Sequence, residues 1–401
     1  MKRFAILTEI NDCNYGAQLQ GFALAAILRT LGAEVEQLNF WYRPYNKALW
    51  GTLAKRKTLS GQIFQFLSLA YRLKSLSDAQ AWLKRSLRSK SFLESHIPLS
   101  IHTYHSYKDL ESFPENLYDG IVVGSDQIWN PEHMGVPNPF LVRNLPLSVP
   151  RFAYAASIGV PSIPAARKEE YSSALKHFTA ISLREHSNVS EIQTYTSYPV
   201  TNVLDPTLLL DRQAWEKLCF LDFPSPVQST ETCIYWLGAP QHLIPLARDF
   251  APCHIYTEPS FLRHRENHHS IHSILDNMNG VQYHPDAGPL QFLRALYHTK
   301  AIVTDSYHAL LFAANLQKPC TFVSGSATWR EKMSIRINDF ISQYTEGFPL
   351  CTIEAIQAPT TIPLSEAFSK AKKNSLKWLE TTLGLKHPPK NTPSIPKLHF
   401  P

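Results

Sequence analysis

Residues 4–40 read FAILTEINDCNYGAQLQGFALAAILRTLGAEVEQLNF, and this stretch decides the fold class. An apolar run at 4–8 has the length of a buried strand, and apolar residues then recur at helical spacing until Gly32 ends the pattern. A second apolar run follows at 35–40. A strand, a helix and a second strand in this order form a βαβ unit, which predicts a parallel sheet.

The same alternation recurs over the rest of the chain. It predicts further strands at 120–123, 152–157, 180–183, 233–237, 254–257, 281–284, 301–304 and 320–323. Because 401 residues exceed one ordinary hydrophobic core, we expect two Rossmann-like α/β domains with mostly parallel sheets that face a central cleft.

The domain limits follow from where this alternation is interrupted. We expect a first domain at residues 1–204 and a second at 205–360, with a helical, basic insert in the first domain at about 45–117. A helix within 361–385 is expected to pack back on the first domain. The Pro- and Lys-containing tail at 386–401 is expected to be loose.

The insert interleaves lysines and arginines, among them Lys84, Arg85, Arg88 and Lys90, with Leu, Phe and Trp. One interpretation is an amphipathic surface that contacts anionic lipid head groups or a lipid-linked glycan. The other is a helical hairpin with a solvated basic face. Both stay open from the sequence.

Composition excludes several classes of protein. With 44% apolar and 18% charged residues, disorder over most of the length is not expected. No apolar run of about 18 residues occurs and the start of the chain becomes polar early, so we expect a cytoplasmic protein whose contact with the inner face of the membrane would be peripheral, through the insert. The net charge of +6 suits an anionic small substrate, and we expect no nucleic acid as partner because no nucleic-acid motif is present.

A metal site is not expected either. The six cysteines form no CxxC pair, and no HExxH or DxD motif and no GxxxxGK phosphate loop occurs. The histidines within residues 264–272 have helical spacing, but without accompanying carboxylates we interpret them as a solvated surface element.

Ligands of parallel α/β sheets bind beyond the carboxyl ends of the strands, so the residues that follow each strand are the candidates for a site. After the first strand, Asn14, Gly16 and Gln18 are candidate substrate-binding residues. The alternative is that the asparagine and glycine form only a helix cap.

The strand at 120–123 is followed by GSDQIWN, which places Ser125, Asp126 and Trp129 close together. A carboxylate, a hydroxyl and a flat ring are the groups that hold a sugar. The alternative is that the polar residues cap a helix while Trp129 belongs to the core. Ser157, at the end of the next strand, is a further candidate for substrate binding.

Arg184 follows the strand at 180–183, and its planar fork matches a carboxylate or a phosphate, although pairing with Glu185 is an equal alternative. Asp305, Ser306 and His308 follow the strand at 301–304. The imidazole there can bind an anion or act as a general acid or base.

A basic stretch after the strand at 320–323 contains Lys332 and Arg336. It would either close over a phosphate in the cleft or form a solvated helix.

Together these segments resemble the polysaccharide pyruvyl transferase family. The matching segments, in the order of the family, are NDCNYGAQLQGFAL (11–24), YDGIVVGSDQIWNP (118–131), FAYAASIG (152–159), SLRE (182–185), VLDPTLLL (203–210) and TDSYHALLFAANLQKP (304–319). The resemblance implies a GT-B-like fold of two Rossmann-like domains. It also implies that phosphoenolpyruvate is the donor substrate for ketal pyruvylation of a glycan or lipid-linked oligosaccharide, with no metal and no cofactor.

Carried over residue by residue, the resemblance places Arg184 and His308 on the carboxylate or phosphate of the donor, with Arg336 matching more loosely. The general acid would be His308 or, as the second choice, Asp126. Arg336 or Lys332 would help Arg184 to hold the phosphate.

Two rival functions stay open from the sequence. One is a metal-independent glycosyltransferase of the same two-domain type that uses a nucleotide-sugar donor. The other is a non-catalytic glycan-binding protein built on the same fold.

Overall fold

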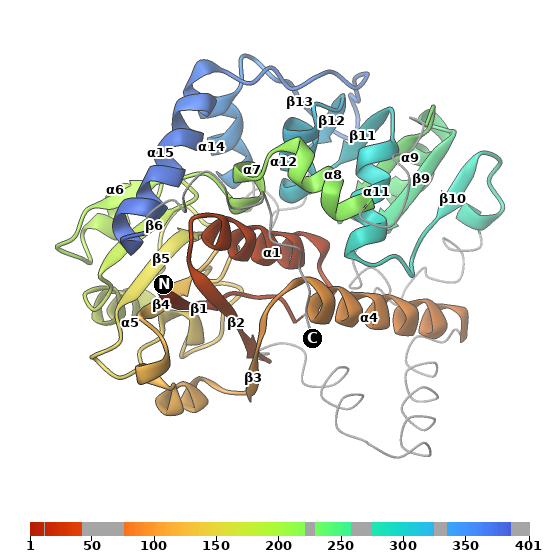
Figure 1. The fold of residues 1–401 in the computed structure, drawn as a ribbon. Helices are drawn as coiled ribbons and strands as arrows, with labels where there is room; N and C mark the ends of the chain where they lie inside the picture. Colours follow the sequence, from red (N-terminus) through yellow and green to blue (C-terminus); the bar gives the residue numbers. More distant parts are fainter. Residues whose placement is uncertain (12, 42–75, 221–228, 258–273, 325–334, 386–401) are drawn as a thin grey trace.

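The computed structural model describes residues 1–11, 13–41, 76–220, 229–257, 274–324 and 335–385. It contains two parallel sheets with helices packed around them, as the alternation of strands and helices predicts (Figure 1). The expectation of an α/β fold with parallel sheets is therefore confirmed.

The first sheet has seven strands in the order β3-β2-β1-β4-β5-β6-β7. Its strands are β1 (Arg3–Leu7), β2 (Glu34–Phe40), β3 (Leu99–Tyr104), β4 (Gly120–Val123), β5 (Arg151–Ala156), β6 (Ala180–Leu183) and β7 (Val200–Asn202). All six neighbouring pairs are parallel. The strand order reverses between β1 and β4, which is where a parallel sheet of this kind leaves a crevice for ligands.

The second sheet has six strands in the order β10-β9-β8-β11-β12-β13 and is also parallel. Its strands are β8 (Thr232–Trp236), β9 (Cys253–Thr257), β10 (Val281–Tyr283), β11 (Ala301–Thr304), β12 (Cys320–Val323) and β13 (Leu350–Cys351). Here the order reverses between β8 and β11. The strands at the two reversal points supply two residues of the site described below, Asp126 after β4 and His308 after β11.

Eight of the α-helices in the described residues form the core and the site that are discussed below. They are α1 (Tyr15–Thr30), α4 (Leu76–His96), α7 (Pro206–Leu209), α8 (Arg212–Phe220), α11 (Pro289–His298), α12 (Tyr307–Leu316), α14 (Ile335–Tyr344) and α15 (Glu366–Leu383). The remaining ones are α5 (Lys168–Leu175), α6 (Val189–Gln193) and α9 (Leu243–Asp249).

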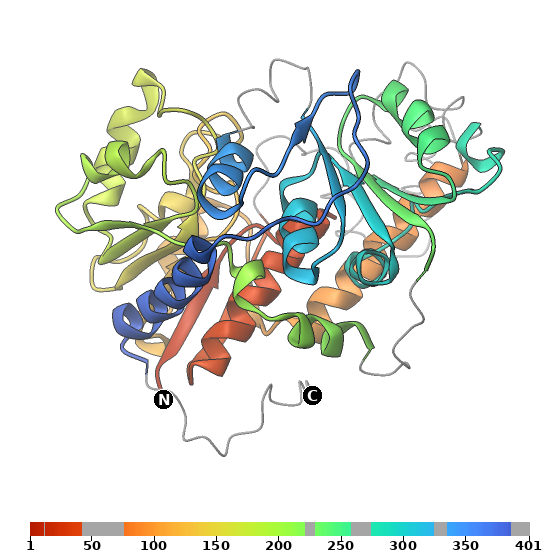
Figure 2. The same cartoon turned by 90° about the horizontal axis from the view of Figure 1, so that it is seen from above.

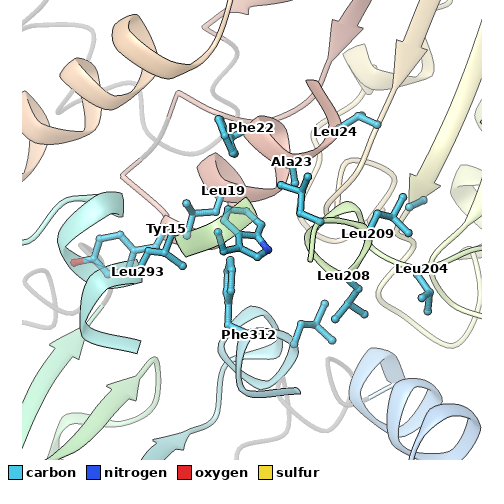
Figure 3. Packing of buried hydrophobic residues seen from close by; sticks show 14 of the residues in the cluster. Tyr15, Leu19, Phe22, Ala23, Leu24, Leu204, Leu208, Leu209, Leu293 and Phe312 are labelled. Atoms are coloured by element: carbon cyan, nitrogen blue, oxygen red, sulfur yellow. The ribbon is translucent and has the colours of Figure 1, made fainter. Parts of the chain in front are cut away.

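A common apolar core joins the two halves (Figure 3). Helix α1 is apolar on nearly all sides and is buried along most of its length, because it lies between the first sheet and helices of the second half. Around Trp215 of α8, Phe22 of α1 and Phe312 of α12 pack with ring centroids 5.9 and 5.0 Å away. Each such buried ring contributes about 1.5–3 kcal/mol, so packing holds the two halves in one arrangement.

The described part of the insert differs from the expectation of a purely helical segment. Residues 99–104 form strand β3, which pairs with β2 at the edge of the first sheet. The Ser100 hydroxyl accepts a hydrogen bond from Asn39 N, which supports this pairing. The polar sequence of β3 fits an edge strand, and for that reason it lacks the apolar run by which the other strands were predicted.

The helical part, α4, runs beside α11 of the second half (Figure 1). Arg85 is buried and donates to the carbonyl oxygens of Cys13 and Thr257, one from each half. Arg88 forms an ion pair with Asp286. Neither interpretation of the insert holds for Arg85, because the fold surrounds its guanidinium with acceptors, and contact between the insert and a membrane stays a prediction. Lys84 and Lys90 are exposed.

Helix α15 lies against the first half, near the N-terminus (Figure 2). The Ser375 hydroxyl accepts from Leu204 N, and Lys2 Nζ donates to the carbonyl oxygen of Leu383. None of the helices in the described ranges is long and apolar enough to cross a membrane. The histidines of 264–272, the tail at 386–401 and the insert residues 45–75 lie outside the described residues.

Candidate active site

The site lies where the strand ends of the two sheets meet. Arg184 follows β6, Asp126 follows β4, and His308 lies in the first turn of α12 after β11. Asp205 begins α7, which lies between the two sheets in the chain. These four side chains come within contact distance of one another although β4 and α12 are far apart in the sequence.

Arg184 is the centre of the site, and its side chain is only 2% exposed. Its Nη1 donates to Asp205 Oδ2 at 2.7 Å, while Asp126 Oδ1 lies 3.7 Å from Nη2 and Glu185 Oε1 lies 3.7 Å from Nε. The guanidinium also lies 4.5 Å from the centre of the Tyr307 ring. Burial opposes its charge, but these neighbours outweigh burial and raise the pKa of Arg184 above its ordinary value.

Asp205 links the arginine to the histidine. Its Oδ1 accepts from the backbone N–H and the hydroxyl of Thr207, so that one oxygen caps α7. Its Oδ2 accepts from Arg184 and lies 3.7 Å from His308 Nε2. Burial by itself would raise the pKa of Asp205, but His308 and Arg184 lower it well below the ordinary range. Asp205 is therefore a carboxylate that Arg184 and His308 share.

His308 is held from the other side by α1. A Cβ added to Gly16 would lie 2.2 Å from His308 Nδ1 and 2.5 Å from its Cγ. Glycine is thus the residue that lets the helix approach the imidazole this closely. The expectation that Gly16 belongs to the site is supported by this contact, although its part is to seat the histidine.

Arg336 reaches the site from α14 and is buried. Its guanidinium lies 5.1 Å from the centre of the Tyr307 ring. Tyr307 therefore lies close to two guanidinium groups, those of Arg184 and Arg336. Burial, together with the charge of Arg184, lowers the pKa of Arg336 to about 10. Asp339 of the same helix accepts from the backbone N–H and the hydroxyl of Ser187, which fixes α14 on the first half.

The carboxylates of the site differ in the direction of their pKa shifts. Burial would raise the pKa of Asp126, but His308 and Arg184 lower it below the ordinary value. Burial raises the pKa of Glu185, which accepts from the Ser157 hydroxyl and from Ile158 N. Asp126 also has a φ of 74°, a left-handed conformation that costs an L-residue free energy and is enriched at functional sites.

Among the buried nitrogen atoms of Arg184 and His308, three have no hydrogen-bond partner within the described ranges. They are Nε and Nη2 of Arg184 and Nε2 of His308. A buried polar group without a partner is costly, and native structures rarely leave one without a reason. Cationic groups with unfilled hydrogen-bonding capacity, held by a rigid frame of carboxylates, are suited to a small anion.

Several predicted site residues have structural roles. Asn14 and Ser306 cap α1 and α12, Gln18 donates to Ile10 O, and Asp305 accepts from Leu237 N. The Ser125 hydroxyl donates to Ala155 O and, at 3.4 Å, to Asp205. These contacts set the loops that carry the charged residues.

The expectation that Trp129 holds a sugar is wrong. Its side chain is fully buried, donates to Phe140 O and packs against Phe178 in the core of the first half. The alternative of a core residue is therefore the one observed. Lys332 lies outside the described residues.

Two residues of the site were not predicted from the sequence. Asp205 was noted only as a domain limit and as part of the VLDPTLLL segment, and Tyr307 only as a neighbour of His308. The available signal for Asp205 was an acidic residue directly before a proline after a strand, which indicates a helix cap rather than a counterion.

Comparison with known proteins gives a family. The model of a family described as polysaccharide pyruvyl transferase matches residues 14–326, which include Asp126, Arg184, Asp205 and His308. A search of curated proteins finds no match.

Several solved structures are similar in fold. The UDP-GlcNAc 2-epimerase of Methanocaldococcus jannaschii is 12% identical with a TM-score of 0.47, over 94% of this chain and 93% of that one. The enzyme of Neisseria meningitidis bound to UDP-GlcNAc is 12% identical with a TM-score of 0.46, over 96% and 99%. The Escherichia coli ADP-heptose LPS heptosyltransferase II is 12% identical with a TM-score of 0.37, over 96% and 98%. Such distant similarity carries no argument about function.

Proposed function

The chain belongs to the polysaccharide pyruvyl transferase family, and from this premise we propose that it transfers the pyruvyl group of phosphoenolpyruvate to two hydroxyls of a glycan, as a ketal. The family is a transferase family. The product would be a ketal, made during the synthesis of a cell-surface or extracellular polysaccharide.

The observation that supports this proposal best is that buried nitrogen atoms of Arg184 and His308 have no hydrogen-bond partner in the described residues. Phosphoenolpyruvate carries a carboxylate and a phosphate, both of which accept hydrogen bonds from guanidinium and imidazolium groups. Arg336, beside the same tyrosine ring, would add charge to hold the phosphate as it leaves.

The proposed reaction has two steps. In the first step a proton is added to the methylene carbon while the oxygen of one sugar hydroxyl bonds to the adjacent carbon and loses its proton. In the second step a second hydroxyl oxygen bonds to the same carbon and loses its proton, and the bond to the phosphate oxygen breaks. Inorganic phosphate is released and the ketal remains.

The pKa shift of Asp126 indicates which residue accepts a proton and which donates one. Because the pKa of Asp126 is lowered, this group is ionised near neutral pH and is suited to accept the proton of a hydroxyl. The proton donor to carbon is then His308, which lies next to the carboxylate of Asp205. Asp126 as general acid, the second choice from the sequence, is disfavoured.

The first test is calorimetric titration of phosphoenolpyruvate into the wild type and into Arg184→Lys and His308→Gln. Loss of one charge-assisted hydrogen bond is worth about 1.5–3 kcal/mol, so each variant should bind roughly 10- to 150-fold more weakly. Arg143→Ala is the control, because this arginine is exposed and lies outside the site.

The same titration with nucleotide sugars tests the rival donor. Saturable binding of a nucleotide sugar, with none of phosphoenolpyruvate, would favour a glycosyltransferase and overturn the proposal. Thermal unfolding of each variant shows whether a lost signal comes from a lost fold.

A further inference from the structure

A second cavity lies on the second sheet, beside α11. It has a volume of about 540 Å³, which is within the range of small-molecule sites of roughly 300–1,000 Å³. Glu231 and Thr299 in its lining precede β8 and β11, so this part lies at the amino ends of these strands. The cavity shares no lining residue with the strand-end site.

A hydrogen-bonded chain of three side chains lines this cavity. Glu231 Oε2 lies 2.6 Å from His254 Nε2, and His254 Nδ1 lies 2.8 Å from His284 Nε2. The carboxylate requires a proton on His254 Nε2, and the two imidazoles share a hydrogen bond between His254 Nδ1 and His284 Nε2. Nδ1 of His284 takes no part in this chain.

The charges of the cavity are compensated within it. Two arginines, Arg88 and Arg294, and two carboxylates, Glu231 and Asp286, belong to its lining, and Asp286 is paired with Arg88 at 2.9 Å. Burial and the neighbouring His254 lower the pKa of His284, which keeps that imidazole neutral. Such a lining gives little attraction to a phosphate or carboxylate.

The same groups remain accessible to a neutral ligand. The side chains of Glu231 and His254 are 32% and 26% exposed, and those of Arg88 and Asp286 are 39% and 29% exposed. Hydroxyl groups both donate to carboxylates or imidazole nitrogens and accept from guanidinium N–H groups. A molecule with many hydroxyls and no charge fits this set.

We propose that this cavity binds an uncharged sugar unit, as a second glycan contact apart from the strand-end site. The inference rests on the proposed function in taking a glycan as partner, but it does not depend on the donor. Arg88 belongs to α4, so the insert would contribute to glycan binding through this residue. In the described part of the chain no group of three His, Cys, Asp or Glu side chains could hold a metal ion.

Saturation-transfer NMR with the methyl glycosides of glucose, galactose, mannose and N-acetylglucosamine tests the proposal on the full chain. We expect at least one glycoside to receive saturation. Ala295→Trp fills the cavity from α11 without changing the Glu231 chain, and Glu231→Gln removes the carboxylate charge. Glu231→Gln should weaken binding about tenfold or more, the effect of losing one hydrogen bond to a charged group, and Ala295→Trp should weaken it at least as much because the ring occupies the space of the ligand.

Arg184→Ala separates the two sites. It should abolish binding of phosphoenolpyruvate and leave the saturation of the glycoside unchanged. The inference is overturned if none of the four glycosides receives saturation, or if Ala295→Trp and Glu231→Gln leave the transfer intact. If a glycoside binds as expected while phosphoenolpyruvate does not bind to the wild type, the proposed donor fails and this inference stands.

Discussion

Asp205→Asn is the substitution that tests most directly how the site is built. Asparagine keeps the shape and can keep the oxygen that caps α7, but it places an N–H₂ group opposite Arg184 Nη1, where Asp205 Oδ2 accepts at 2.7 Å. The carboxylates of Glu185 and Asp126 remain, each with an oxygen 3.7 Å from the guanidinium.

The expected loss of stability follows from these contacts. Removing one partner of a buried ion pair costs about 3–5 kcal/mol, and a lost charge-assisted hydrogen bond by itself costs about 1.5–3 kcal/mol. Because two other carboxylates partly compensate Arg184, we expect the free energy of unfolding to fall by about 3 kcal/mol. Urea unfolding at unchanged m-value measures it.

The direction in which the affinity for phosphoenolpyruvate changes in Asp205→Asn tests the role of this carboxylate. If Asp205 acted only as a negative charge beside an anion site, its neutralisation would strengthen binding. If it orients Arg184 and His308, as the geometry indicates, binding weakens by about tenfold or more despite the lost charge.

Asp211→Asn is the matched control, since Asp211 caps the start of α8 through Ala214 N and is exposed. Asparagine is about as good a cap as aspartate, so its unfolding free energy should change by less than about 0.5 kcal/mol. Equal stability of Asp205→Asn and Asp211→Asn, or tighter donor binding in Asp205→Asn, would refute the reasoning.

Three further predictions concern the frame of the site. Gly16→Ala would normally stabilise a helix by about 0.5–1 kcal/mol, but its Cβ would lie 2.2 Å from His308 Nδ1, so we expect lower thermal stability and about tenfold weaker donor binding by calorimetry. Arg85→Met leaves two carbonyl oxygens without their donor, and we expect a loss of about 2–4 kcal/mol in urea unfolding, against less than about 0.5 kcal/mol for the exposed Lys84→Met. Because the pKa of Asp205 is lowered on folding, its stabilisation is complete above the unfolded value of about 3.9 and is lost as the pH falls. The stability difference between wild type and Asp205→Asn should therefore shrink between pH 6 and pH 3, and a constant difference would contradict the ionised carboxylate.

The sequence by itself predicted ten of the thirteen described strands to within about a residue, because a strand buried on both faces is a continuous apolar run. It also proposed Arg184, Asp126 and His308 as site residues, since parallel strands bring the residues that follow them to one edge. The strands β3, β7 and β13 were not predicted, because each is short or half-exposed and lacks such a run.

Only the tertiary structure decided which of these residues meet. Asp205 is 21 residues from Arg184, and no local pattern shows that its second oxygen serves a histidine of the other half. Trp129 follows a strand end as the site residues do, but its ring turns into the core. Arg85 has the charge of a surface residue, yet it is buried because acceptors from both halves surround it. A side chain's direction and its distant partners depend on how the elements pack, and packing is not encoded in any single segment.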